Sequence, residues 1–450
     1  MPLTDAHPSA RPTNVRWTVF ALSFSISVLL YLHRYAFGFM KPILSKEWGL
    51  TATELGELDG VFSVCYTGLQ FPLAILADGL GVRLVLTVLI LVGCCGLAVM
   101  GSASSVKALW YAQAILGTGQ SAVYACLSRI GRSWFPLAIR TTLQGAVGVT
   151  AGRLGALLSS LLFATLLLGK LELTLQTAIG ILVAVGVANA LLFVLVFRNS
   201  PRRHPAVNSA ELQLIEGSDP MAAAGAEQMS VTQMLRSMTP RSMVNVGCLC
   251  VQSILSTIAD NLYSNWIPLF LVQVHHLEYK KMGVSSALPL LGGAIAGLIG
   301  GALNDLAISW TKNRRWSRVA VAFVGKGMAA VLIFAALLFY ERPYVFCLFL
   351  FFVKLFGDWS LATAWGVVTD IGGRATASMF AFNNSVAGLG QIAAPLAYGY
   401  IVDHFGWRPV IVSVGVTYVL CALSWLAIDC TIPVIRELRT TEANNQEGRT

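Results

Sequence analysis

The chain has 450 residues, of which 56% are hydrophobic and only 12% are Asp, Glu, Lys or Arg. A soluble domain has roughly 25% charged residues, so this composition leaves too little polar surface for a globule in water. A helix needs roughly 20 apolar residues to cross a bilayer, so the chain can supply a dozen spans, which excludes a soluble enzyme on one anchor. In a soluble protein, a net charge of +9 would suggest that the chain binds nucleic acid. In a membrane protein, we expect the positions of the basic residues to indicate which loops are cytoplasmic.

Apolar runs bounded by charge, Pro or Gly predict an all-α membrane protein with twelve transmembrane helices. The first run is too long for a signal peptide and has no small-residue cleavage pattern, so we expect it to stay in the mature protein. In chain order the predicted spans are 17–43, 54–77, 83–103, 107–129, 140–168, 173–197, 242–272, 281–306, 318–340, 343–369, 375–402 and 408–431.

Apart from Arg34, Arg153, Lys326 and Lys354, which lie deep in the spans, the basic residues divide unequally between the two sides of the membrane. The side that holds both termini collects 19 Lys and Arg, and the opposite side collects 8. Because cytoplasmic loops are enriched in cations, both termini are predicted to be cytoplasmic. We expect a multi-pass plasma-membrane protein, which means the inner membrane if the source is a bacterium.

The segment 198–241 is the only long polar stretch between spans, and it divides the chain into two sets of six. The second span ends at Asp78 and the eighth ends at Asp305, so the halves echo each other. Two pseudo-symmetric six-helix lobes are typical of a secondary transporter. The predicted organisation is a leader (1–16), a first lobe (17–197), a cytoplasmic linker (198–241), a second lobe (242–431) and a cytoplasmic tail (432–450).

Several motifs, in this order, resemble the major facilitator superfamily. Asp78, Gly81 and Arg83 match its conformational loop motif, although Gly79 replaces the usual basic residue. More specifically, the chain resembles the anion:cation symporters, which include hexuronate and galactonate carriers and the vesicular glutamate and sialic acid carriers. The segments that carry this resemblance are Tyr31–Arg34, Ser63–Tyr66 with Gln70 and Pro72, Arg129 with Trp134–Pro136 and Arg140, Asn265–Pro268, Leu288–Pro289, Gly300–Gly301, and Trp365 through Asp370–Gly373, Asn383–Asn384 and Pro395 to Gly399.

The resemblance implies the major facilitator fold, transport by alternating access and a small organic anion as substrate. Three positions depart from the family pattern. His33 stands where the proton-coupled carriers have an Asp, and Gln113 and Gln120 stand where they have an Arg and a Glu. The family's proton relay therefore cannot be transferred residue by residue.

Two arginines inside the spans are the candidate anion-binding residues. Burying Arg in a membrane costs about 2.5 to 3.5 kcal/mol, so such a residue usually faces a polar cavity or a partner. Arg34 lies in the first span, and Arg153 lies about 20 Å beyond Arg140 along the fifth. A guanidinium binds carboxylate or phosphate with two parallel hydrogen bonds. The alternative is that each arginine pairs with a carboxylate and merely ties helices together.

Four further residues are candidates for proton coupling: His33, Asp260, Lys354 and Asp358. Lys354 and Asp358 lie one helical turn apart and are expected to form an ion pair, which is either structural or a switch. Asp260 has no basic neighbour within a turn, so it is expected to protonate readily. Lys326 is expected to reach the cytoplasmic surface. Glu54, Glu57 and Asp59 are expected to form a solvated face.

Uncharged side chains complete the predicted binding site. Gln113 and Gln120 share a helix face and can bond hydroxyls or carboxylates without titrating. Asn383 and Asn384 either bond a substrate or join helices, and the spacing to Pro395 favours Asn384. The aromatic residues at family cavity positions, each of which could also be a packing or interfacial residue, are Tyr31, Tyr66, Trp266 and Trp365.

These features together predict a monomeric transporter of a small organic anion, a sugar acid or another carboxylate, and proton symport is the expected mode. No catalytic residue, metal, cofactor or nucleic-acid partner is expected. The nine cysteines fall in apolar stretches without metal-ligand spacing. Two alternatives stay open. One is an exchanger or uniporter of organic anions or organophosphates, and the other is a membrane receptor that binds a metabolite and signals through the 198–241 linker.

Overall fold

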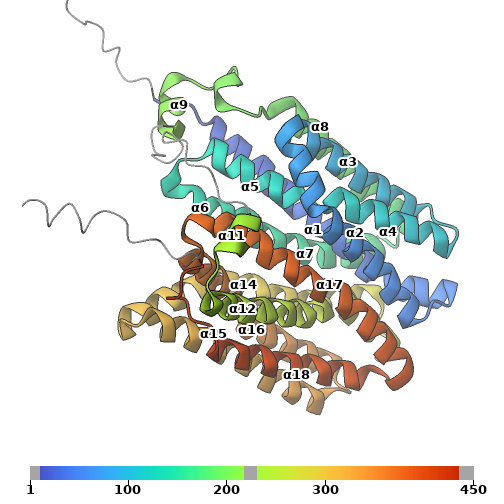
Figure 1. Cartoon of the computed structure of the whole chain (residues 1–450). Helices are drawn as coiled ribbons and strands as arrows, with labels where there is room; N and C mark the ends of the chain where they lie inside the picture. Colours follow the sequence, from blue (N-terminus) through green and yellow to red (C-terminus); the bar gives the residue numbers. More distant parts are fainter. Residues whose placement is uncertain (1–10, 217–230, 435–450) are drawn as a thin grey trace, which may run out of the picture.

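Six spans form a first lobe in the computed structural model, which describes residues 11–216 and 231–434 (Figure 1). Every regular element in these residues is a helix. The elements of this lobe are α1 (Val15–Trp48), α2 (Ala52–Leu80), α3 (Val82–Gly101), α4 (Val106–Gln120), α5 (Val123–Trp134), α6 (Leu137–Gly145), η1 (Ala146–Thr150), α7 (Ala151–Leu158), η2 (Ser159–Lys170) and α8 (Leu175–Val196).

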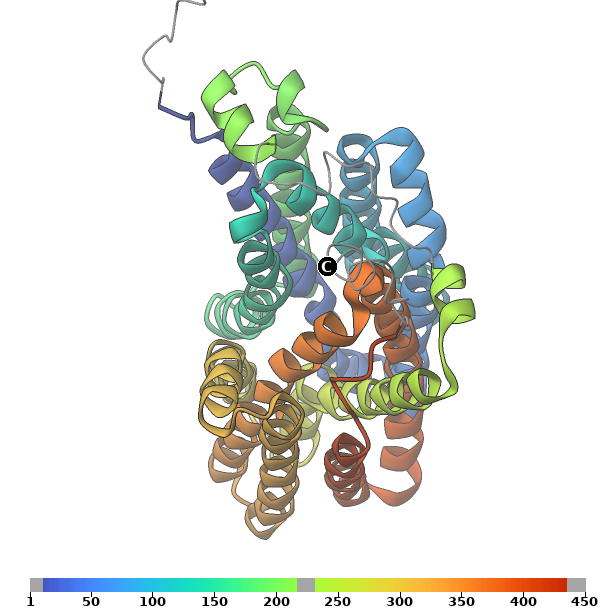
Figure 2. The ribbon, with the colours of Figure 1, turned by 60° about the vertical axis from the view of Figure 1, so that its left-hand side comes forward.

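The second lobe follows a linker that contains η3 (Pro201–Arg203), α9 (Ser209–Glu216) and α11 (Val231–Ser237). Figure 2, which looks nearly along the helices, shows the first lobe above the second. The elements of the second lobe are α12 (Pro240–Asn261), η4 (Leu262–Trp266), α13 (Ile267–Gln273), α14 (Tyr279–Thr311), α15 (Arg314–Ala336), η5 (Leu337–Phe339), α16 (Pro343–Gly372), η6 (Gly373–Ala375), α17 (Thr376–Phe405) and α18 (Trp407–Leu426).

The twelve predicted spans correspond to these helices. Eleven helices in the described residues are long and apolar enough to cross a membrane. The remaining prediction, 107–129, is two shorter helices, α4 and α5, which are separated by a turn at Ser121 and Ala122. Next to that turn, α4 packs so closely on α3 that a Cβ on Gly119 would lie 2.3 Å from the backbone nitrogen of Gly93. The all-α, twelve-helix prediction is confirmed.

Local sequence signals set where α1 ends and α2 begins. Gly49 ends α1 in the left-handed conformation, with a φ of 67°, which glycine adopts without steric cost. Thr51 then caps α2, accepting from the Glu54 backbone N–H, and the Glu54 carboxylate accepts from the Thr51 backbone N–H in return. This capping box satisfies two backbone donors that a helix start leaves free.

The predicted conformational motif joins four helices of the first lobe, α2, α3, α5 and α8. Asp78 forms a 2.5 Å ion pair with Arg129 of α5. Arg83 donates to the carbonyl of Val194 near the end of α8, where the helix dipole favours a cation. Gly81 turns the chain at a φ of 86°, and a Cβ there would lie 2.4 Å from the side chain of Asn199.

In the second lobe, Asp305 was expected to take the part that Asp78 has in the first, but Asp370 makes the corresponding ion pairs. Asp305 is exposed and makes no ion pair in the described part of the chain. Asp370 instead binds Arg318 at 2.6 Å and Arg314 at 3.2 Å. Its side chain is buried, so this carboxylate fixes the end of α16 to the start of α15.

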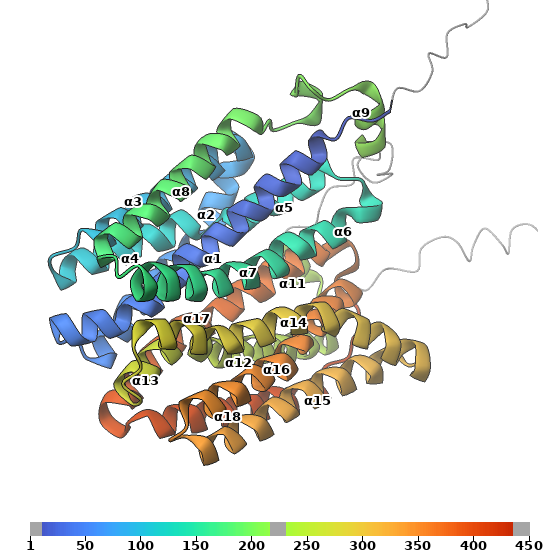
Figure 3. The same ribbon diagram turned by 180° about the vertical axis from the view of Figure 1, so that it is seen from behind.

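The two lobes meet most closely at one end of the bundle. We call the end where α1 begins the terminal end, and the opposite one the far end. At the far end, α2 packs on α17 and α1 packs on α13, and Figure 3 shows α1 and α7 bordering the second lobe. A Cβ on Gly56 would lie 2.3 Å from the carbonyl oxygen of Pro395, so the α2–α17 crossing needs glycine. Asp403 of α17 also accepts from the backbone N–H groups of Ala52 and Thr53.

Candidate functional site

A cavity of about 260 Å³ lies between the lobes. This volume suits a small metabolite, because pockets for drug-sized ligands run to roughly 300–1,000 Å³. Its walls come from α1, α2, α4, η1 and α7 of the first lobe and from α12, η4, α16 and α17 of the second. The charged and amide side chains that line it are Arg34, Asp59, Gln113, Arg153, Asp260, Asn261, Asn265, Asn384 and Gln391.

Two π-helical segments border this cavity, one in each lobe. Gly148 and Val149 come from η1, and Ser264 and Asn265 come from η4. A π-helical turn inserts an extra residue into the helix and is frequent at functional sites. These turns place backbone and small side chains at the cavity wall, where straight α-helices would present a continuous ridge.

Arg34 is held in the cavity wall by aromatic rings and an amide. Its guanidinium carbon lies 4.4 Å from the centre of the Tyr66 ring, 5.1 Å from that of Tyr31 and 5.2 Å from that of Phe62. Its Nε donates to the Gln120 side chain at 3.0 Å. Its Nη2 is buried and has no hydrogen-bond partner, and no carboxylate pairs with Arg34 in the described residues. A buried donor without a partner is costly, so an anion bound to this guanidinium would relieve that cost.

The two glutamines of α4 have different places. Gln120 accepts from Arg34 and donates to the carbonyl of Leu30 at 3.2 Å, so it positions the guanidinium. Gln113, about two turns earlier on the same helix, is buried and lines the cavity. Of the predicted pair, one residue therefore holds Arg34 and the other lines the cavity.

Arg153 lies in a cluster of four charges that joins the lobes, and we call these residues the interlobe cluster: Arg153, Asp260, Lys354 and Asp358. Arg153 comes from α7 of the first lobe and binds Asp358 at 2.7 Å and Asp260 at 3.4 Å. Lys354 binds Asp358 at 2.7 Å and also contacts Asp260. The two cations and two anions balance. Arg153 thus adopts the helix-tying arrangement that the sequence left as an alternative to anion binding.

The structure overturns the expectation that Asp260 is an isolated acid. In sequence it has no basic residue within a helical turn, but its contacts with Lys354 of α16 and Arg153 of α7 come from other helices. Lys326 also differs from its expected place at the cytoplasmic surface. It is buried and donates to Ser256 at 2.8 Å inside the second lobe.

A second buried ion pair was missed by the sequence interpretation. Asp59 was expected on a solvated face, and Lys41 was counted among the basic residues on the side opposite the termini, but both are buried and bind each other at 2.5 Å. The Lys41 ammonium lies 3.9 Å from the ring centre of Trp266 in the second lobe, a cation–π contact. The predicted first span, 17–43, ends just after Lys41, but α1 continues to Trp48 and so places Lys41 about two turns before its end, inside the bundle.

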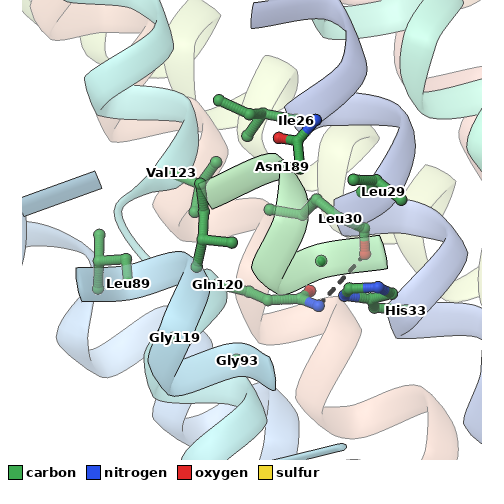
Figure 4. A pocket seen from close by; sticks show the side chains of 12 residues that line it. Ile26, Leu29, Leu30, His33, Leu89, Gly93, Gly119, Gln120, Val123 and Asn189 are labelled. Carbon is green, nitrogen blue, oxygen red and sulfur yellow. Dashed lines mark hydrogen bonds between the residues drawn. The ribbon is translucent and has the colours of Figure 1, made fainter. Parts of the chain in front are cut away.

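His33 does not face the central cavity. It lies on the face of α1 that packs on α8, where Nε2 is 3.2 Å from the carbonyl oxygen of Leu182. Figure 4 shows it beside Gln120 in a separate pocket of about 30 Å³ within the first lobe, which Asn189 also lines. That space suits one or two water molecules rather than a substrate.

Asn383 and Asn384, which the sequence could assign either to a substrate or to helix packing, have different surroundings in the structure. Asn384 lines the cavity, whereas Asn383 accepts from Ser253 at 3.1 Å within the second lobe. Trp365 lines the cavity from α16, and a Cβ on Gly148 would lie 3.3 Å from its ring, so it reaches across to the first lobe. Trp266 is buried at the far end.

Comparison with known proteins finds similar transporters in bacteria. The chain is 27% identical to the probable sulfoacetate transporter of Cupriavidus necator over 388 residues, covering 84% of this chain and 85% of that one. It is 22% identical to the D-galactonate transporter of Escherichia coli over 433 residues, covering 93% and 97%. It is 24% identical to the probable galactarate/D-glucarate transporter of Bacillus subtilis, covering 55% of each chain.

Solved structures and a family model complete the comparison. A bacterial homologue of the human lysosomal transporter Spinster, in an inward-facing and unoccupied conformation, has the same fold with a TM-score of 0.71 at 16% identity. The alignment covers 92% of this chain and 97% of that one. The Major Facilitator Superfamily model matches residues 23–325, which is more than half of the chain. With its twelve helices in two lobes around a central cavity, the chain belongs to the Major Facilitator Superfamily of membrane transporters.

Proposed function

We propose that this protein carries a small organic anion, a sugar acid or another carboxylate, across the plasma membrane by alternating access. The two lobes would rock around the central cavity, exposing it to one side and then to the other. Three relatives support the choice of substrate class, because their names identify sulfoacetate, D-galactonate and galactarate or D-glucarate as cargo. All of these are organic acids of a few carbon atoms.

The main support for the proposal is the environment of Arg34. It is a cation at the wall of a cavity between lobes, it has an unpartnered buried donor, and no carboxylate neutralises it in the described residues. A guanidinium in this state binds carboxylate strongly, since a charged hydrogen bond in a partly dehydrated site is stronger than a neutral one. Gln113 and Asn384 supply uncharged groups for hydroxyls.

Counterflow in proteoliposomes tests the proposal directly. Vesicles loaded with an unlabelled sugar acid should accumulate the labelled one when they contain the wild-type protein. Arg34→Ala should abolish this accumulation. Arg408→Ala should retain it, because Arg408 pairs with Glu341 where both side chains are more than 60% exposed. Counterflow that survives in Arg34→Ala would remove Arg34 from the site.

Proton symport is the proposed mode of coupling. Asp260 and Asp358 are the candidate proton acceptors, because protonation of either would weaken its contact with Arg153 and so loosen the lobes. The position of His33 in a separate pocket favours these acids over the imidazole. Uptake driven by an imposed pH gradient supports symport. Uptake that ignores the gradient while counterflow persists would establish the alternative, an exchanger or uniporter of organic anions or organophosphates.

A single chain is the proposed functional unit, with both termini in the cytoplasm. The cavity is formed by the two lobes of one chain, so a second copy is not needed to complete it. With cytoplasmic termini, the closely packed far end faces outward. The described conformation would then shield the cavity from the outside.

A further inference from the structure

The charged residues that line the cavity, counted together with their ion-pair partners, leave a single excess positive charge. Four charged residues line it, namely Arg34, Asp59, Arg153 and Asp260. Asp59 is neutralised by Lys41 at 2.5 Å. Arg153 and Asp260 belong to the interlobe cluster, whose two cations and two anions cancel. Arg34 is left as the one cavity-lining cation in the described residues that has no acid beside it.

Arg34 offers the cavity one binding edge. Aromatic rings lie within 4.4 to 5.2 Å of its guanidinium carbon, and Gln120 takes its Nε. The Nη side of the guanidinium remains for a ligand, and its Nη2 has no hydrogen-bond partner. One such edge accommodates one carboxylate or sulfonate group.

Asp260 is the member of the interlobe cluster that is most exposed to the cavity. Its side chain is 33% exposed, compared with 15% for Arg153, 9% for Asp358 and 1% for Lys354. The nearby cation Lys326 lies behind Ser256, one turn before Asp260 on α12, and does not line the cavity. The cluster is neutral as a whole, but it presents a carboxylate to the ligand.

We propose that the cavity selects an organic anion with a single negative charge, and that Asp260 is the residue that excludes a second one. The inference rests on the proposed function and refines its substrate class. Arg34 and Asp260 line the same cavity of about 260 Å³, so a second anionic group on a substrate held at Arg34 would share that space with the Asp260 carboxylate. Like charges a few ångströms apart in a partly buried site repel strongly. The amides of Asn261, Asn265 and Asn384 suit a hydroxylated end instead.

Two pairs of ligands, matched in size and shape but different in charge, distinguish the effect of ligand charge on binding from the effect of ligand shape. D-galactonate and galactarate differ by a hydroxymethyl group in place of one carboxylate, and so do 2-hydroxyethanesulfonate and sulfoacetate. Competition with a labelled substrate, or ligand-induced thermal shift, would be measured for each pair on the purified full-length protein at neutral pH. In the pair that binds better, the singly charged ligand should bind the wild-type protein at least about tenfold more tightly than the doubly charged ligand does.

Asp260→Asn should shift this ratio toward the doubly charged ligand by about tenfold or more, because it leaves the interlobe cluster with one net positive charge. Asp260→Glu keeps the charge and should keep the wild-type ratio. Glu341→Gln removes one negative charge at an exposed position outside the cavity and should leave the ratio unchanged. A purely structural role for Asp260 would weaken both members of a pair equally.

The possible failures are distinct. Tighter binding of the doubly charged ligand to the wild-type protein would overturn the charge selection, even if Asp260→Asn does not fold, and would leave the proposed function standing. An unchanged ratio in a folded Asp260→Asn variant would remove Asp260 from this role. Failure of all four ligands to bind the wild-type protein, together with no counterflow of any organic acid, would contradict the proposed function and this inference with it.

Discussion

Arg153 shows how the partners of a membrane-buried charge decide its role. In sequence it is a second candidate anion ligand beside Arg34. In the structure it bonds Asp358 at 2.7 Å and Asp260 at 3.4 Å across the lobe interface. Removing one partner of a buried pair leaves the other charge uncompensated, which costs more than the pair itself contributes.

Arg153→Ala is therefore expected to destabilise the protein by about 3 kcal/mol, because it leaves the cluster with one net negative charge. Arg153→Ala combined with Asp358→Asn restores neutrality and should lose less than the sum of the two single variants. Thermal melting of the purified variants would give the coupling, expected to be about 1 to 3 kcal/mol. Additive losses would mean that Arg153 and Asp358 do not interact.

The buried ion pair of Lys41 and Asp59 at the far end leads to a comparable prediction about stability. Lys41→Met leaves Asp59 buried without its partner and should cost about 3 to 5 kcal/mol. Lys41→Met with Asp59→Leu removes both charges and should recover most of that loss. Lys46→Met, on the same helix at an exposed position, is the matched control. The pair would be of little importance if Lys41→Met melted like the wild-type protein.

At the scale of helices, the crossing of α2 and α17 determines how closely the lobes pack at the far end. The backbone of Gly56 approaches the Pro395 carbonyl too closely for any side chain, and a Cβ there would lie 2.3 Å from the oxygen. Asp403 adds hydrogen bonds to the first N–H groups of α2, where the helix dipole favours a negative charge. These contacts all belong to the conformation described here.

Gly56→Ala should therefore shift the protein toward conformations in which the far end is open. Spin labels attached at Glu47→Cys and His404→Cys, in a background without the native cysteines, would report the separation of α1 from α17. Gly68→Ala on the same helix is the control, because a Cβ there meets nothing within 4 Å. A label distance that Gly56→Ala leaves unchanged would show that this crossing does not set the closure.

At the scale of the whole molecule, the unequal distribution of basic residues predicts orientation. A fluorescent protein that folds only in the cytoplasm, fused after Thr450, should fluoresce, and the same fusion after residue 104 should not. Alkaline phosphatase fusions at these points should give the opposite pattern. Phosphatase activity of the fusion after Thr450 would place the C-terminus outside and reverse the proposed direction of the cavity.

The twelve helices and the transporter class follow from local properties of the sequence. A span is a local run of apolar residues, because each helix satisfies its own backbone hydrogen bonds in lipid. Helix boundaries such as Gly49 and Thr51 follow from the residues at that position alone. Arg34 could be identified in the same way, since a charge within a span is visible without knowing its neighbours.

The partners of each charge depend on tertiary contacts. Asp260 has no basic neighbour in sequence, yet Lys354 and Arg153, from positions 94 and 107 residues away, lie against it. Lys41 and Asp59 are unremarkable until α1 and α2 pack and bury both. Hydropathy determined by itself that this chain is a membrane-spanning bundle. Only the packing of helices distant in sequence decided which charges form ion pairs and left Arg34 at the cavity wall with no acid beside it in the described residues, because Coulomb interactions depend on distance in space.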